Sequence, residues 1–295
     1  MTIELLKGSV DNHIHCCPHI NKRSTNIFEV IKKAEQLEMH AVGLMDNFSN
    51  TSGYASLVKK YLPKLKLKVF GGLIMEPPSG GVSYENAKIS LNYSYFQNDG
   101  AKFISFPTHH TRHIAKLEKR EKNYITNCFH VPDTGPTQET MKILELIAQK
   151  NIVMNTGHLS AKETINLVKY AKKIGVKKIL IPSNTFNLTT IAKLKKFRPK
   201  FEFSYFFISK ATDIPLTHVD GEKHKIQGTN EKLLKILIKT AGPKNVILSS
   251  DCGVSILPKP HIGFSNFINH IQKLGFSKKE IEYMIKINPK KLFNL

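Results

Sequence analysis

Two histidines one residue apart, His13 and His15, stand in the stretch VDNHIHCCPHI behind an acidic residue. In a β-strand, alternate side chains point to the same face, so both imidazoles could reach one metal ion. On a helix this spacing would separate the two side chains, so metal binding here requires a strand. A short His-x-His motif also occurs by chance, and its meaning depends on the elements that position it.

Short apolar stretches alternate with longer amphipathic ones along the whole chain. We expect strands at residues 8–15, 41–46, 68–75, 101–108, 152–158, 178–184, 201–207 and 246–251. Stretches such as SAKETINLVKYAKKIG open with Asn, Thr or Ser and close near Gly, as helix capping predicts. The sequence thus predicts an α/β protein: a single (β/α)8 TIM-barrel domain over residues 1–295, rather than an open doubly wound sheet. The stretch from HHTRHIAKLEK to FHVPDTGP predicts a longer insertion after strand 4.

The active site of a TIM barrel lies at the carboxyl ends of its strands. In this sequence, polar residues follow the predicted strands at that end: His13 and His15, Asp46, His109 and His110, His158, Asn184, and Asp251. His and Asp dominate the set, and both are common zinc ligands. The set therefore favours a metal centre over separately placed surface histidines.

These motifs resemble the amidohydrolase superfamily of metal-dependent hydrolases, including its phosphotriesterase-like members. Proteins of that superfamily carry His-x-His on strand one, a His on strand five and an Asp on strand eight, and often end in an Asn-Pro helix. The stretches DNHIH, NTGHLS, SSDCG and INPKKLFNL are similar to these features and span nearly the whole chain. More narrowly, SFPT, NTGHLSAKE and LSSDCG resemble an uncharacterised branch whose substrate the motifs do not specify.

The sequence departs from the pattern at two strand ends. Met45 and Asn47 stand where that branch has a Lys followed shortly by a His on strand two, and Asn184 stands near the expected His of strand six. A neutral amide is a poor zinc ligand. The resemblance therefore implies one ion rather than the two of a binuclear centre, with zinc the favoured metal.

The resemblance implies a role for each remaining ligand. His13, His15 and Asp251 would hold the ion, with His158 either a fourth ligand or a donor that orients the others, and Asp251 would act as general base toward the metal-activated water. Further candidates for metal or substrate binding are Asp46, His109, His110 and Asn184, with His218 and His224 held in reserve. Glu163 reads as the partner of Ser160 in a capping box rather than as a residue that orients His158.

Three functions remain open at this point. The first is hydrolysis of a small-molecule amide, ester, lactone or phosphoester; the others are a nuclease or phosphodiesterase of the same fold, and a degenerate barrel that binds a metal or ligand without turnover. The formal charge of +21 suits an anionic substrate, but lysines spread over helices do not favour a nucleic-acid partner. No membrane span or signal peptide is predicted, and four cysteines without a CxxC pair indicate a cytoplasmic protein with reduced thiols. A homo-oligomer is compatible with the sequence.

Overall fold

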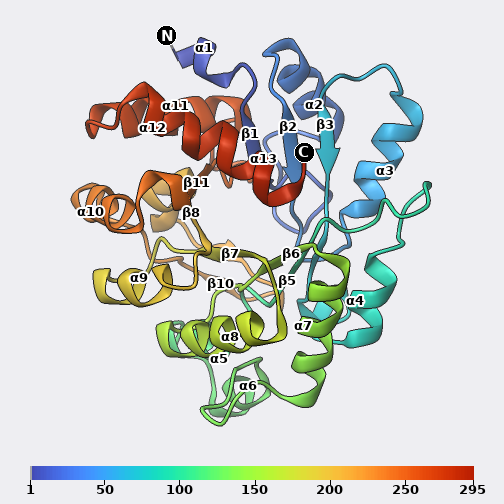
Figure 1. Cartoon of the computed structure of the whole chain (residues 1–295), viewed down its shortest axis with the longest axis vertical. Helices are drawn as coiled ribbons and strands as arrows, with labels where there is room; N and C mark the ends of the chain where they lie inside the picture. Colours follow the sequence, from blue (N-terminus) through green and yellow to red (C-terminus); the bar gives the residue numbers. More distant parts are fainter. Residues whose placement is uncertain (1) are drawn as a thin grey trace.

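Parallel strands occupy the centre of the molecule and helices surround them, as Figure 1 shows for residues 2–295, the part of the chain that this computed structural model describes. One sheet has the order β1-β2-β3, formed by Val10–Ile14, Ala41–Leu44 and Lys68–Phe70. The other has the order β11-β8-β7-β6-β5-β4, formed by Val246–Ser249, Lys200–Ser204, Lys178–Pro182, Val153–Asn155, Phe103–Ser105 and Leu73–Ile74. All pairings in both sheets are parallel, and every predicted strand has a counterpart.

The predicted strand at residues 68–75 is divided into β3 and β4 by two glycines. A Cβ atom at Gly71 would lie 2.4 Å from the carbonyl group of Thr51, and one at Gly72 would lie 2.3 Å from the carbonyl oxygen of Phe103. The N–H group of Gly72 donates to the hydroxyl oxygen of Thr51 at 2.9 Å instead of to a strand neighbour. The close approach of a loop therefore interrupts the ladder, as a glycine inside a strand often signals.

The two sheets meet between β1 and β11. Ile14 and Cys252 form an isolated parallel bridge, and the N–H group of His15 donates to the carbonyl oxygen of Cys252 at 2.8 Å. The N–H group of Asp251 donates to the carbonyl oxygen of His13 at 2.9 Å. The chain is thus a mixed α/β protein whose strands have a TIM-barrel-like arrangement, and these contacts lie at the carboxyl ends where the functional residues are expected.

Amphipathic helices cover the outside of the strands (Figure 1). The longer ones are α2 (Ile27–Gln36), α3 (Ser52–Tyr61), α7 (Gln138–Lys150), α8 (Ala161–Ile174), α9 (Leu188–Lys195), α10 (Glu231–Ala241) and α11 (Pro260–Lys273), and the shorter ones are α1 (Thr2–Leu6), α4 (Tyr84–Ser90), α12 (Lys278–Glu282) and α13 (Asn288–Phe293). In α8, Ser160 and Glu163 form the predicted capping box, and Gly175 ends the helix in the left-handed conformation. No helix among residues 2–295 is both long and apolar enough to cross a lipid bilayer.

Two segments without long elements lie at the carboxyl ends of the strands. After β5, the chain forms the short helices α5 (Arg112–Leu117) and α6 (Lys122–Asn127) before α7 begins. After β8, it forms two 3₁₀ turns and the antiparallel pair β9 (Leu216–Thr217) and β10 (Lys223–His224). Arg120 of the first segment pairs with Asp220 of the second and lies 2.8 Å from Nε2 of His224. The two segments are therefore joined by side-chain contacts.

The base of the strands is closed by the C-terminal helix α13, which follows a π-helical turn at Tyr283–Ile287. Leu292 and Phe293 pack with the inward-facing residues Val10 and Phe70, and the rings of Phe70 and Phe293 lie 4.7 Å apart. The side-chain amide of Asn288 donates to the carbonyl oxygen of Val246 at 2.6 Å. The Asn-Pro motif thus fixes the helix that fills the end opposite the predicted active site.

Candidate metal centre

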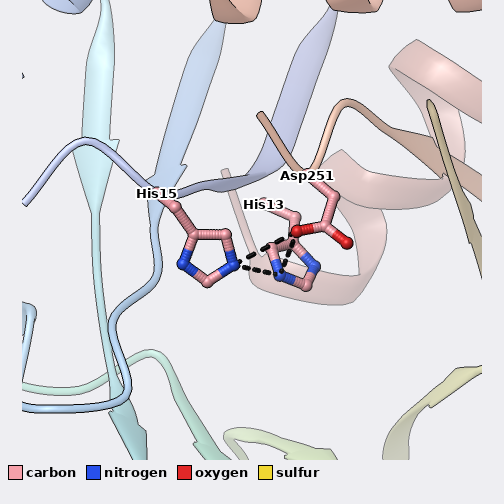
Figure 2. Close-up of side chains that lie close together, drawn as sticks. All are labelled: His13, His15 and Asp251. Atoms are coloured by element: carbon pink, nitrogen blue, oxygen red, sulfur yellow. Dashed lines mark hydrogen bonds and ion pairs between the residues drawn. The ribbon is translucent and has the colours of Figure 1, made fainter. Parts of the chain in front are cut away.

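Three predicted ligands, His13, His15 and Asp251, converge at the carboxyl ends of β1 and β11; they are called the triad below (Figure 2). The Nε2 atoms of the two histidines lie 3.1 Å apart. Oδ1 of Asp251 lies 3.5 Å from Nε2 of His13 and 3.2 Å from Nε2 of His15. Each side chain keeps between 13% and 16% of its surface exposed, so the three groups are largely desolvated and still reachable.

The side chains of the triad suit a divalent ion such as zinc. Two imidazole nitrogens and one carboxylate oxygen are preferred zinc ligands, and ligands at about 2.0–2.1 Å in a tetrahedron lie roughly 3.3–3.4 Å from one another. The measured separations of 3.1, 3.2 and 3.5 Å bracket that value. Three ligands also leave a coordination position open, as catalytic zinc sites do.

Irregularities of the backbone set the directions in which these side chains point. The register of β1 against β2 shifts between Asp11 and Ile14, and such irregularities redirect side chains at active sites. Asp251 follows β11 with a φ of +51°, a left-handed conformation that Asp adopts more readily than most residues. The buried carboxylate of Asp11 accepts hydrogen bonds from the N–H groups of Ser250 at 3.0 Å and His13 at 3.4 Å, so it ties the two strand ends together.

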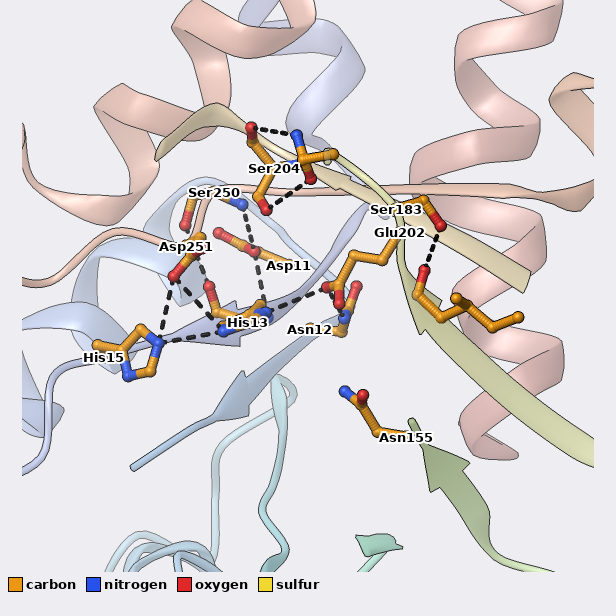
Figure 3. A network of polar contacts seen from close by, with 12 residues as sticks. Asp11, Asn12, His13, His15, Asn155, Ser183, Glu202, Ser204, Ser250 and Asp251 are labelled. Atoms are coloured by element: carbon orange, nitrogen blue, oxygen red, sulfur yellow. Dashed lines mark hydrogen bonds and ion pairs between the residues drawn. The ribbon is translucent and has the colours of Figure 1, made fainter. Parts of the chain in front are cut away.

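Glu202 on β8 is a site residue that the sequence interpretation did not identify. Its carboxylate is buried; Oε1 accepts from the side-chain amide of Asn12 at 2.7 Å and lies 3.3 Å from Nδ1 of His13 (Figure 3). A carboxylate on the far nitrogen of a ligand histidine fixes its tautomer and its ring orientation. The stretch FEFSYFF is the strand predicted at residues 201–207, and Phe201 and Phe203 pack in the core. Glu202 lies between them and faces the opposite side, which is the signal that strand alternation offered.

The charges of these groups shift their pKa values in different directions. Burial lowers the pKa of His13, but the neighbouring carboxylates of Asp251 and Glu202 outweigh burial and raise that pKa to about 9. For His15 burial prevails, so its pKa is lowered. Burial alone would raise the pKa of Asp251, but His13 and the hydrogen bond from His15 lower it below its ordinary value. Without a metal ion, Asp251 is therefore ionised at neutral pH and His13 carries a proton that an arriving ion must displace.

His158 faces the same cavity as the triad without joining its close cluster. Gly157 positions it: the residue has a φ of +64°, and a Cβ atom there would lie 2.2 Å from the carbonyl oxygen of Pro107. The N–H group of His158 then donates to that oxygen at 3.1 Å. Burial lowers the pKa of His158 to about 4, so its imidazole is neutral at neutral pH and able to bind a metal.

Two connected cavities lie above the strand ends. The triad cavity, of about 90 Å³, is lined by the triad, His158, His109, Arg23 and residues of the segment after β8. The wide cavity, of about 380 Å³, shares His109, His158, Phe207 and His218 with it and continues between the segments after β5 and β8. The two cavities together provide a small chamber at the triad and a larger one beside it.

The remaining predicted candidates lie in different places. Asp46 is buried, accepts from the hydroxyl of Ser49 at 2.5 Å and has a pKa raised by burial, but it is not part of the triad cluster. Asn184 accepts from the N–H group of Ser204 at 3.2 Å and faces the wide cavity. His110 packs its ring against Tyr124 and lines neither cavity. The structure therefore gathers His13, His15 and Asp251 closely, with His109 and His158 on the same cavity. The other candidates, Asp46, Asn184 and His110, lie outside this cluster.

A second group of possible metal ligands is formed by His109, Glu118 and His218; it is called the loop cluster below. Nδ1 of His218 lies 2.9 Å from Oε1 of Glu118. Glu76, buried at the end of β4, accepts hydrogen bonds from the N–H groups of Thr108 and His109, both at 2.6 Å, and thereby shapes the loop that carries His109. His109 and His218 were candidates from the sequence, whereas Glu118 and Glu76 were not.

Comparison with known proteins is informative at the level of family and fold. The model of a family of unknown function, DUF6282, matches residues 8–200, which is more than half of the chain. The chain belongs to this family. The matched region holds His13, His15 and His158 and stops before Glu202 and Asp251. No curated protein matches the sequence.

Solved structures share the fold at low sequence identity. An amidohydrolase from Pseudomonas aeruginosa superposes with a TM-score of 0.64 at 9% identity, over 99% of this chain and 97% of the other. An organophosphorus hydrolase from Deinococcus radiodurans gives a TM-score of 0.60 at 11% identity, over 99% and 93%. A weak promiscuous lactonase template engineered for organophosphate hydrolysis gives a TM-score of 0.60 at 12% identity, over 99% of this chain and 97% of the other. The resemblance to the amidohydrolase superfamily, including its phosphotriesterase-like members, is confirmed for the fold.

Proposed function

We propose that this protein is a metal-dependent hydrolase of a small-molecule amide, ester, lactone or phosphoester. One observation carries the proposal: two imidazole nitrogens and a carboxylate oxygen lie 3.1–3.5 Å apart at the carboxyl ends of two strands, on the wall of a cavity. The fold shared with hydrolases supports it. We infer one ion at this centre, because Met45 packs in the apolar interior and Asn184 bonds to Ser204 where further ligands would be needed.

Each residue of the centre has a separate task in this proposal. His13, His15 and Asp251 would hold the ion, with His158 as the fourth candidate. When bound, a divalent ion supplies Lewis acidity, which lowers the pKa of a coordinated water toward about 7 and polarises the bond to be cleaved. The carboxylate of Asp251 accepts the proton of the attacking water and returns it to the leaving group. Glu202 holds the ring of His13 through Nδ1, so that Nε2 faces the centre.

The wide cavity would hold the body of the substrate. Its volume of about 380 Å³ lies within the roughly 300–1,000 Å³ of small-molecule sites. Arg23 lines the triad cavity, and its buried Nη2 has no hydrogen-bond partner among the described residues. Lys225 lines the wide cavity. A substrate with an anionic group would pair with these cations, which is why we favour an anionic small molecule over a neutral one.

We also infer that residues 1–295 form a single domain built on a closed eight-stranded barrel with a longer insertion after the fourth strand. The bridge between Ile14 and Cys252 supports closure. Because β3 and β4 together make the third barrel strand, β5 is the fourth, and helices α5 and α6 between β5 and α7 would be the insertion. The four cysteines are free and buried, which supports a reducing compartment such as the cytoplasm.

The proposal is tested by metal content and hydrolysis together. Protein purified without chelator is analysed for metals and assayed on chromogenic esters, lactones, anilides and phosphoesters, each in a neutral and an anionic form. We expect hydrolysis that disappears with chelator, returns with Zn²⁺, and is absent in the double variant His13→Ala/His15→Ala. We expect Arg23→Met to weaken activity on the anionic forms more than on the neutral ones.

The fold of the double variant distinguishes a catalytic ion from a structural one. Because the apolar layers lie below the triad, the variant should keep its circular dichroism spectrum and cooperative unfolding. A metal-loaded wild type without activity on any class of bond would favour a binding barrel without turnover. A wild type without metal at His13 and His15 would refute the hydrolase proposal.

A further inference from the structure

The loop cluster shares no residue with the triad, although His109 and His218 line the triad cavity. His109 comes from the loop after β5, Glu118 directly follows α5, and His218 comes from the turn between β9 and β10. One ligand atom from each of the three side chains lies within 4.8 Å of the others. Two imidazoles and one carboxylate thus meet where the segments after β5 and β8 touch.

His218 is the most deeply buried member of this cluster. Only 3% of its side chain is exposed, and its Nδ1 atom lies 2.9 Å from Oε1 of Glu118. Its Nε2 atom is buried and has no hydrogen-bond partner among residues 2–295. A buried polar atom without a partner costs free energy, so native proteins rarely keep one without a reason.

The neighbours of His218 are consistent with a metal ion. The rings of His109 and His218 lie 4.3 Å apart with an angle of 54° between their planes. The ring of His224 lies 5.2 Å from that of His218, and Nε2 of His224 lies 4.0 Å from Oε2 of Glu118. Imidazole-rich sets with one carboxylate suit Zn²⁺ and similar transition metals rather than Mg²⁺ or Ca²⁺.

We propose that His109, Glu118 and His218 form a second metal site, for Zn²⁺ or a similar transition-metal ion, that fastens the segment after β8 to the segment after β5. The proposal does not depend on hydrolase activity. Besides His218 and Glu118, these segments are joined by Arg120, which pairs with Asp220 and contacts His224. An ion would add direct bonds between three separate loops and hold the wall of the wide cavity in one position.

Metal titration of the metal-free full-length chain tests the site. Binding of Zn²⁺ and of Co²⁺ is measured for the wild type, His218→Gln, the double variant His13→Asn/His15→Asn, and His110→Gln. We expect two ions in the wild type and one in each of the first two variants. His110→Gln is the matched control: it removes a neighbouring imidazole that packs on Tyr124 outside the cluster, and it should still bind two ions.

The outcomes separate this site from the triad. Two ions in His218→Gln, or a single wild-type ion that His218→Gln retains, would overturn the second site and leave the hydrolase proposal standing. A single ion lost in His218→Gln but kept by the His13/His15 variant would support the loop site and overturn the triad centre. If His218→Gln does not fold, Glu118→Gln takes its place with the same expectation.

Limited proteolysis measures whether the ion holds the segment after β8 in place, which the metal titration does not. Zn²⁺ should protect residues 214–228 from limited proteolysis in the wild type and in the His13/His15 variant, because the triad does not hold this segment. In His218→Gln the same segment should be cut at the same rate with and without Zn²⁺. Zn²⁺ protection that persists in His218→Gln would contradict a clamp at this cluster.

Discussion

The triad and the loop cluster use similar side chains but differ in what holds them. His13, His15 and Asp251 stand at the ends of paired strands, and backbone hydrogen bonds between β1 and β11 fix their relative positions. His109, Glu118 and His218 stand on three loops, joined mainly by contacts between side chains. The triad is therefore organised before any ion arrives, whereas the geometry of the loop cluster depends on the relative positions of three loops.

The supporting carboxylates show the same contrast. Glu202 reaches His13 from β8, two strands away, and holds Nδ1 of its ring directly. Glu76 instead accepts hydrogen bonds from the backbone of the loop that carries His109. One carboxylate sets the direction of a side chain and the other sets the path of a chain segment. We expect the first arrangement to serve chemistry and the second to serve closure of the cavity.

The largest expected effect follows from Asp251→Asn. This change keeps the shape of the side chain and removes its basicity, so turnover of any substrate identified should fall roughly 100-fold or more while metal is lost only in part. Asp46→Asn is the matched control, because Asp46 is buried nearby but bonded to Ser49. Equal losses in both variants would assign Asp46 to a second ion beside the triad, and full activity in Asp251→Asn would exclude it as the base.

The next effect separates the two supporting carboxylates. Glu202→Gln should weaken metal binding at the triad about 10- to 100-fold, the range for loss of a group that orients a ligand. Glu76→Gln removes an equally buried carboxylate and should leave the triad affinity unchanged, while it weakens the loop cluster. Isothermal titration of each variant measures both affinities. A triad that responds equally to the two changes would remove the distinction between them.

The pH dependence of metal binding should also differ between the two groups. The pKa of His13 is raised to about 9, so His13 is protonated below that pH and a proton competes with the ion. Affinity at the triad should therefore rise about tenfold per pH unit from neutrality and level off near pH 9. At the loop cluster, His109 offers no such competition, because burial lowers its pKa well below the ordinary value. Titrations in matched buffers test this, and a triad affinity independent of pH would contradict the raised pKa.

The smallest effect is expected for Asn184→Ala. The change removes the acceptor for the N–H group of Ser204, which should lower the free energy of unfolding by about 1 kcal/mol. Metal content at the triad should stay the same, because Asn184 lies outside that cluster. Denaturant unfolding and elemental analysis measure the two quantities. Loss of the triad ion in this variant would make Asn184 a ligand after all.

Much of the fold was predictable because the strands bury both faces. Every predicted strand has a counterpart, but the observed strands are shorter at their carboxyl ends. The strand predicted at residues 152–158 ends at Asn155, since Gly157 turns the chain with a positive φ. The break at Gly71 and Gly72 was not predictable, because it depends on the approach of Thr51 from another loop.

The site was predictable where residue type and strand position agree. His13 and His15 alternate in a short strand and Asp251 follows an apolar run, so their convergence could be inferred from the barrel pattern. Glu202 was not predicted as a site residue, because it stands among aromatic residues that do belong to the core. Glu118 was not predicted for a different reason: contacts between loops follow no sequence period from which they could be inferred.

The way in which α13 and the triad are assembled also bears on the biosynthesis of the protein. Asp11 and Ser250 are 239 residues apart in the chain, yet their hydrogen bond holds β1 to the end of β11. A nascent chain leaving the ribosome therefore carries His13 and His15 long before Asp251 exists, and it cannot fill the base of the strands until Phe293 has emerged. Contacts of such long range form slowly, so the ion should enter after translation, into a chain that has already folded.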